Sequence, residues 1–131
     1  MGRKKKSGDG GLLTPLELEI MTVLWKLGEG SVHDVLKQLD PDKEYAYNTV
    51  STILRLLLAK GVVDARAEGR GHFYLPVLDK QEYEARTLKH VVSTVFDGEP
   101  TSLLRRLLDD QSLSKQTLEE LRSLIARKGE K

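Results

Sequence analysis

The sequence contains no cysteine, so it has neither a disulfide framework nor a thiolate metal site. Its apolar runs are short, for example the three leucines at 56–58. A membrane-spanning helix needs about 20 apolar residues. The basic N-terminus is not followed by an apolar stretch, which argues against a secretory signal. We therefore expect a cytoplasmic protein without membrane insertion.

A strong excess of one charge is also lacking, because the formal net charge is +1. Residues 1–11 carry four basic residues and one acid, and residues 79–131 carry ten of each. Residues 12–78 carry seven basic and nine acidic residues, a balance of −2. Binding to nucleic acid must therefore depend on where individual charges lie, since the middle segment is not basic as a whole.

The first 11 residues are rich in glycine and lysine and are expected to form a disordered basic tail. The motif TPLE at 14–17 then has the pattern of a capping box, and the helix that follows is predicted to stop at Gly28. Ser31 is predicted to cap a second helix that runs to about Leu39.

A third helix is predicted at about 47–60, and two alternating apolar runs joined by GRG at 69–71 are typical of a β-hairpin. The expected fold is mainly α with a small β-hairpin. A winged helix-turn-helix occupies 12–78, and a C-terminal helical dimerisation module occupies 79–131. In that module we expect helices to about Phe96, then at about 102–109 and 114–128.

The third helix has two chemically different faces at 3.6 residues per turn. Short polar side chains and one arginine form one stripe, without Asp, Glu or Lys: Asn48, Ser51, Thr52 and Arg55. Branched aliphatic residues form the opposite face: Val50, Ile53, Leu54 and Leu57. A face that is merely solvated normally carries long charged side chains.

Such a stripe suits insertion into the DNA major groove, where Asn pairs with adenine and Arg with guanine. The predicted contacts of the recognition helix are Tyr47, Asn48, Thr49, Ser51, Thr52 and Arg55. Tyr45 before the helix and Arg70 at the hairpin tip are predicted to contact the phosphate backbone of the DNA. The alternative is an exposed helix with small polar residues; the preceding helices and the hairpin favour DNA binding.

Several segments resemble the penicillinase repressors of BlaI/MecI type. They are LTPLELEIMTVLW, YNTVSTILRLLLAKG, HFYLPVL, DKQEYEARTLKHVV and LEELRSLI, in this order between residues 12 and 127. The resemblance implies a homodimeric repressor of β-lactam-resistance or other stress genes that binds dyad-symmetric, double-stranded operator DNA. The family's recognition contacts correspond to Asn48, Thr49, Ser51 and Thr52, where several members are more basic.

The resemblance also implies a derepression step, in which a membrane sensor metalloprotease triggers cleavage of the dimerisation region. The corresponding bond lies near Arg106-Leu107, where well-studied members have Asn-Phe. The copper-responsive CopY-type relatives use a C-terminal cysteine metal site, which a chain without cysteine cannot form.

The apolar residues of the C-terminal helices have little protein surface within the same chain to pack against, since the winged helix is already complete. We therefore predict that they meet a second copy of the chain rather than form an intrachain core. They are Val91, Val92, Val95, Phe96, Leu103, Leu104, Leu107, Leu108, Leu118, Leu121, Leu124 and Ile125.

No enzyme, cofactor or metal site is predicted. His33, His72 and His90 are dispersed, and Ser51 lacks the context of a catalytic nucleophile. Trp25 is expected in or near the core. The rival function is a winged-helix module for protein–protein interaction without DNA binding, which the −2 balance of residues 12–78 favours.

Overall fold

The computed structural model describes residues 12–129, so the predicted basic tail at 1–11 lies outside the described residues. The described chain forms two compact units, one that ends at Ala85 and one that starts at Arg86.

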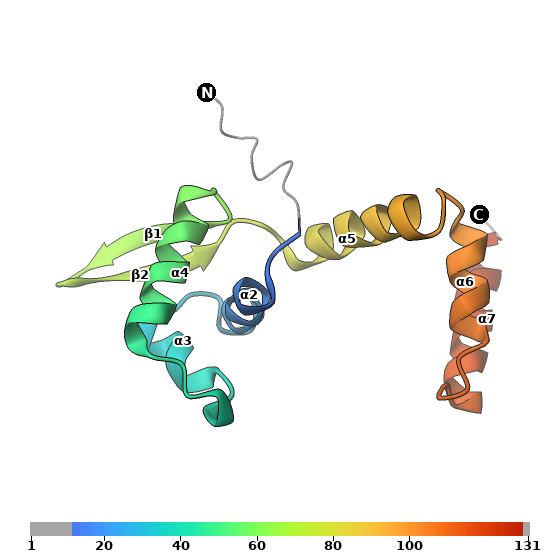
Figure 1. The fold of residues 1–131 in the computed structure, drawn as a ribbon, viewed down its shortest axis with the longest axis horizontal. Helices are drawn as coiled ribbons and strands as arrows, with labels where there is room; N and C mark the ends of the chain where they lie inside the picture. The colour runs from blue at the N-terminus through green and yellow to red at the C-terminus, as the bar shows by residue number, and fades with distance from the viewer. Residues whose placement is uncertain (1–11, 130–131) are drawn as a thin grey trace. The chain divides into compact units, whose positions relative to one another are not determined.

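Three helices and a hairpin make up most of the first unit (Figure 1). The helices are α2 (Pro15–Leu27), α3 (Val32–Gln38) and α4 (Tyr47–Ala59), and a short 3₁₀ turn, η1 (Pro41–Lys43), precedes α4. Strands β1 (Val63–Glu68) and β2 (Gly71–Pro76) pair antiparallel, with Val63 opposite Pro76 and Glu68 opposite Gly71. The predicted helices, their order and the hairpin are confirmed, and together they form a winged helix.

Local signals account for most boundaries of these elements. Thr14 and Ser31 each accept a hydrogen bond from the third residue of their helix, and Glu17 and Asp34 bond back to them in capping boxes. Gly61 ends the α4 turn with a φ of +82°, a conformation that favours glycine.

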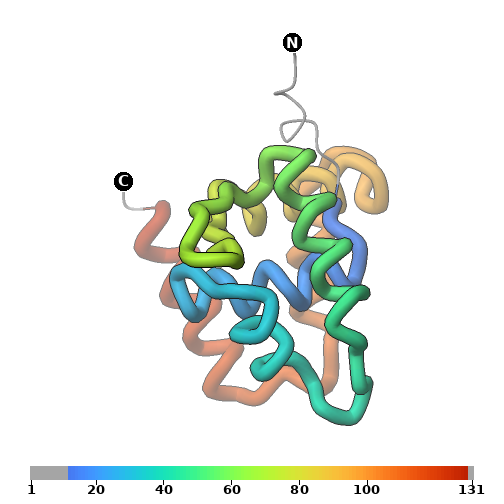
Figure 2. The backbone as a smooth tube through the Cα atoms, turned by 90° about the vertical axis from the view of Figure 1, so that its left-hand side faces the viewer, coloured from blue at the N-terminus to red at the C-terminus, as the bar shows by residue number. Residues whose placement is uncertain are grey.

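The core of the first unit lies where α2, α3 and α4 meet the base of the hairpin. Figure 2 shows α4, in green, along one side of this unit, beside α2 and α3 in blue and cyan. Fully buried side chains come from every one of these elements: Ile20, Met21, Leu24, Val35, Val50, Leu54, Leu57 and Val63. Leu27, the last residue of α2, is 41% exposed, because the helix ends there at the turn.

An additional bridge joins the turn before α3 to the hairpin. The N–H of Gly30 donates to the carbonyl of Tyr74 at 3.0 Å, and the N–H of Tyr74 donates to the carbonyl of Gly30 at 2.8 Å. The pair extends the two-stranded ladder by one antiparallel bridge. The hairpin of β1 and β2 is the wing of the winged helix, and its base is thereby attached to the helix-turn-helix.

Helix α5 (Lys80–Val95) begins within the first unit and continues into the second. Its Tyr83 is buried, its hydroxyl accepts from the N–H of Leu13 at 3.0 Å, and its ring centroid lies 6.1 Å from that of Trp25. The indole N–H of Trp25 donates to the carbonyl of Leu78 at 2.8 Å. The first unit thus closes around the first turn of α5.

The second unit contains the rest of α5, then α6 (Pro100–Leu108) and α7 (Lys115–Gly129). Asp79 accepts hydrogen bonds from the N–H groups of Gln81 and Glu82, so it caps α5. Among the described residues after Ala85, none is buried.

Candidate DNA-binding surface

Helix α4 presents its predicted polar stripe on the outside of the first unit. Val50, Leu54 and Leu57 are fully buried, which fixes the rotation of the helix about its axis. On the opposite side Asn48, Thr52 and Arg55 are exposed, and Thr49 is exposed as well. Ser51 is half-buried at the margin of this face. The exposed face is therefore anchored by packing on the other side.

The start of α4 differs from the starts of α2 and α3. Its N-cap is Ala46, which provides no side-chain hydrogen bond, and its first turn contains no acidic residue. The first N–H groups of a helix without a side-chain cap bond to water or to a ligand, and they favour anions. This end of α4 is thus chemically compatible with DNA phosphate.

The two tyrosines that were predicted to contact DNA have different surroundings. The hydroxyl of Tyr45 lies 3.3 Å from each carboxylate oxygen of Glu19, and its side chain packs against the core. Glu19 also accepts from Lys43 at 3.0 Å. Tyr45 therefore has an internal partner that holds the segment leading into α4.

Tyr47, by contrast, is 44% exposed and its hydroxyl has no hydrogen bond to another residue of the described chain. Its ring lies against the imidazole of His33, with 4.8 Å between the ring centroids.

The wing carries two arginines in different states. Arg66 is hydrogen-bonded to Glu29, at 2.8 Å, and to Glu68, and its guanidinium lies 5.0 Å from the ring centroid of Phe73. These contacts connect the wing to the turn before α3. Arg70 lies exposed at the hairpin tip, next to Gly69, and no ion pair holds it within residues 12–129.

The acidic residues of the first unit do not lie on α4, which contains none. Four glutamates form ion pairs with three basic residues outside this helix: Glu17 with Lys60, Glu19 with Lys43, and both Glu29 and Glu68 with Arg66. The −2 balance of residues 12–78 therefore does not describe the charge of the exposed α4 face.

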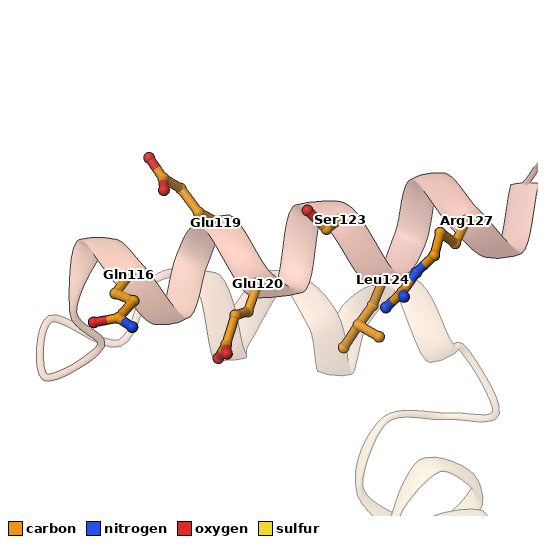
Figure 3. Close-up of a pocket in the computed structure, with 6 residues that line it drawn as sticks. All are labelled: Gln116, Glu119, Glu120, Ser123, Leu124 and Arg127. Carbon is orange, nitrogen blue, oxygen red and sulfur yellow. The ribbon is translucent and has the colours of Figure 1, made fainter.

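The apolar residues predicted at a dimer interface are all at least partly accessible in the single chain. The exposed ones are Val95 (66%), Leu107 (37%), Leu108 (45%), Leu124 (53%) and Ile125 (51%). The half-buried ones are Val91, Val92, Phe96, Leu103, Leu104, Leu118 and Leu121. Figure 3 shows Leu124 on the same side of α7 as Glu120 and Arg127. Arg106 and Leu107 lie inside α6.

Within residues 12–129, no group of three or more His, Asp or Glu side chains is placed to hold a metal ion. In the same range no helix has the length and apolar character needed to cross a membrane.

Reasoning from the sequence missed three contacts around the candidate surface: Tyr45 with Glu19, Arg66 with Glu29, and His33 with Tyr47. Each joins residues from different elements, and no spacing along the chain signals such a pair. The one signal in the sequence for any of these contacts was the aromatic residue Tyr47 at the start of α4.

Three comparisons relate the chain to known proteins. The family model described as Penicillinase repressor matches residues 13–127. The methicillin resistance regulatory protein MecI of Staphylococcus aureus is 22% identical over 116 residues, which cover 88% of this chain and 94% of that protein. The penicillinase repressor of Bacillus licheniformis is 26% identical over 113 residues, which cover 86% of this chain and 88% of that protein.

One solved structure is similar to part of the chain. It is the monomeric form of Bacillus licheniformis BlaI in complex with the blaP half-operator, with 32% sequence identity and a TM-score of 0.48. The similarity covers 56% of this chain and 89% of that chain.

Proposed function

Because the chain belongs to the penicillinase repressor family, whose members are DNA-binding transcriptional repressors and not enzymes, we propose that it is a homodimeric repressor. It binds a dyad-symmetric operator and inserts one α4 helix of each protomer into the major groove. The observation that carries this proposal is the α4 helix itself, with an aliphatic face buried in the core and a polar face without acids at the surface.

In this proposal the exposed face of α4 reads the bases. Asn48 pairs with adenine, Arg55 reaches guanine or phosphate, and the methyl groups of Thr49 and Thr52 contact thymine methyl groups. Ser51 lies at the edge of the groove. Tyr45 acts through Glu19, by holding the chain that enters the helix, and Arg70 of the wing contacts a phosphate.

Dimerisation is supported by the second unit, whose described residues include no buried side chain although they are rich in leucine. Large exposed apolar patches are rare on monomeric proteins and mark interaction sites. A two-fold dimer would bury the same patch from both copies. It would also join two half-sites, because one recognition helix reads few base pairs.

The proposal also includes release of the repressor from DNA by proteolysis. The bond between Arg106 and Leu107 lies near the end of α6, in helical conformation. A protease cleaves an extended segment, so the last turn of α6 must unwind before a membrane sensor metalloprotease, or a protease that it activates, can act. Terminal turns open at low free-energy cost, and no residue of α6 is buried. Arg-Leu in place of Asn-Phe implies a protease of different side-chain preference.

The rival function, a protein–protein module without DNA binding, rests on the −2 charge of residues 12–78. Its support is weaker once the ion pairs are considered, because four of the nine acidic residues are paired with bases. The rival predicts that the chain retains no sequence from a random DNA pool.

The test is selection of bound sequences from random double-stranded DNA by the full chain, followed by measurement of the dissociation constant. The double variant Asn48→Ala and Arg55→Ala is expected to lose specific binding, because each base contact contributes about 1–3 kcal/mol. The control variant, Lys26→Ala with Gln81→Ala, removes a cation and an amide from exposed positions outside α4. Unchanged affinity in the α4 variant would contradict its role as recognition helix.

A further inference from the structure

His33 and Tyr47 form a pair of aromatic side chains beside the first turn of α4. His33 lies in the first turn of α3, Tyr47 is the first residue of α4, and both are exposed. Their ring centroids are 4.8 Å apart and the ring planes meet at 47°. No hydrogen bond to another residue of the described chain uses the ring nitrogens of His33 or the hydroxyl of Tyr47.

The position of the pair relative to the polar face of α4 is set by helix geometry. Tyr47 directly precedes Asn48 and lies one turn before Ser51, so it flanks the polar stripe at its N-terminal end. An α-helix with its side chains is about 10–12 Å wide and the major groove is about 12 Å wide. Side chains that flank the base-reading stripe therefore meet the sugar–phosphate wall of the groove rather than the bases.

We propose that His33 and Tyr47 together bind one backbone phosphate of the operator, with protonated His33 and the Tyr47 hydroxyl as the two donors. This proposal rests on the proposed function of α4 as recognition helix. It adds a contact from α3, which the sequence did not indicate. It also separates the two tyrosines, since the Tyr45 hydroxyl is engaged with Glu19 and that of Tyr47 is not.

His33 has charged and titratable neighbours on α3 and α4. On α3 the charged neighbours are Asp34, whose carboxylate accepts from the N–H of Ser31 at 3.0 Å, and Lys37 one turn later. On α4 the titratable neighbour is Tyr47 itself.

Three carboxylates of the first unit already have basic partners. Glu17 and Glu19 of α2 pair with Lys60 and Lys43, and Glu29 of the turn pairs with Arg66. The carboxylate of Asp34 interacts electrostatically with His33, and a phosphate would add a second anion beside the pair.

The consequence is a pH-dependent affinity. Histidine changes its charge between about pH 5 and 8, and a phosphate binds the charged form. The affinity for the operator is therefore expected to be higher at pH 6.0 than at pH 8.0.

The experiment measures dissociation constants of the full chain on its selected operator at pH 6.0 and 8.0, at constant ionic strength. For each His33 engaged, the wild type is expected to bind up to about tenfold tighter per pH unit within the titration range. His33→Gln should bind like the wild type at pH 8.0 and show no such gain at pH 6.0. Tyr47→Phe should bind several-fold more weakly at both pH values.

Two matched controls complete the design. Tyr45→Phe removes the neighbouring tyrosine hydroxyl and should keep the pH dependence, and His72→Gln removes the histidine of the wing and should keep it too. A full pH dependence in His33→Gln, or its loss in His72→Gln, would overturn the proposal. A wild type that selects no DNA would reject the proposed function, whereas specific binding without any His33 effect would reject this proposal alone. Thermal unfolding of each variant verifies that it is folded.

Discussion

The ammonium nitrogen of Lys60 lies 2.6 Å from the Oε2 atom of Glu17, and the Glu17 side chain is only 5% exposed. The other carboxylate oxygen of Glu17 accepts from the N–H of Thr14 at 2.9 Å. One buried carboxylate thus caps α2 and binds the residue that ends α4. This contact fixes the C-terminal end of the proposed recognition helix to the helix behind it.

Substitution of Lys60 by methionine is expected to lower the free energy of unfolding by about 1–3 kcal/mol at pH 7. The reason is that a buried carboxylate loses its cation. Lys60 itself is half exposed, so a value near the lower limit is expected. Urea unfolding followed by the fluorescence of Trp25, the single tryptophan, measures the change. Lys26→Met is the matched control, and an equal loss there would refute the explanation.

The same pair predicts an acid-sensitive contribution to stability. Burial raises the pKa of Glu17, but the hydrogen bond from Lys60 and the bonds to Thr14 outweigh it, so the pKa lies below the ordinary value of 4.5. An acid with a lowered pKa stabilises the folded state above about pH 4.5, and this contribution is lost as the pH falls through the folded-state pKa. Unfolding free energies from pH 7 to pH 3 should therefore fall less in Lys60→Met than in the wild type.

The first turn of α5 is expected to stabilise the first unit. A fragment of residues 12–85 should melt at a higher temperature than a fragment of residues 12–78, which lacks the buried Tyr83. In the full chain, Tyr83→Phe should cost about 1 kcal/mol, because the N–H of Leu13 loses its acceptor. Circular dichroism melting tests both, and equal melting temperatures of the fragments would place the end of the unit at residue 78.

The exposed arginine of the wing is expected to act through charge. In Arg70→Ala, the slope of log K against log salt should become shallower by about 0.9 for each phosphate that the variant no longer neutralises. Sequence preference should stay the same. Fluorescence anisotropy titrations from 50 to 300 mM salt, roughly the useful range for such slopes, give the value. Lys26→Ala, which removes a cation from α2, should leave the slope unchanged; a similar change there would mean that the effect is not specific to the wing.

Dimerisation is expected to depend on the apolar side chains of the second unit. Leu124→Glu places a carboxylate at a position that is 53% exposed in the single chain. It should convert a dimer to a monomer, because the charge would be buried at the interface. Sedimentation velocity gives the mass. Leu18→Glu, the same change at an exposed leucine of α2, should leave the dimer intact. A wild type that sediments as a monomer would contradict the homodimer.

Much of the fold was predictable because its signals are local. The caps at Thr14 and Ser31, the glycine stop at Gly28 and the Gly-Arg-Gly turn act within a few residues, and each lies where the sequence predicts it. The two faces of α4 were predictable for the same reason, since the helical period alone separates its aliphatic side from its polar side.

The contacts that position the candidate surface were decided only by tertiary structure. Lys60 meets Glu17 across 43 positions of the sequence, and Tyr45 meets Glu19 across 26. Gly30 pairs with Tyr74 only because the hairpin folds back onto the turn before α3. Periodicity and capping tell which side of each element is apolar, but not which residues of two elements face each other. That choice depends on how side chains of given volume pack together in one core, and this packing brought His33 to Tyr47.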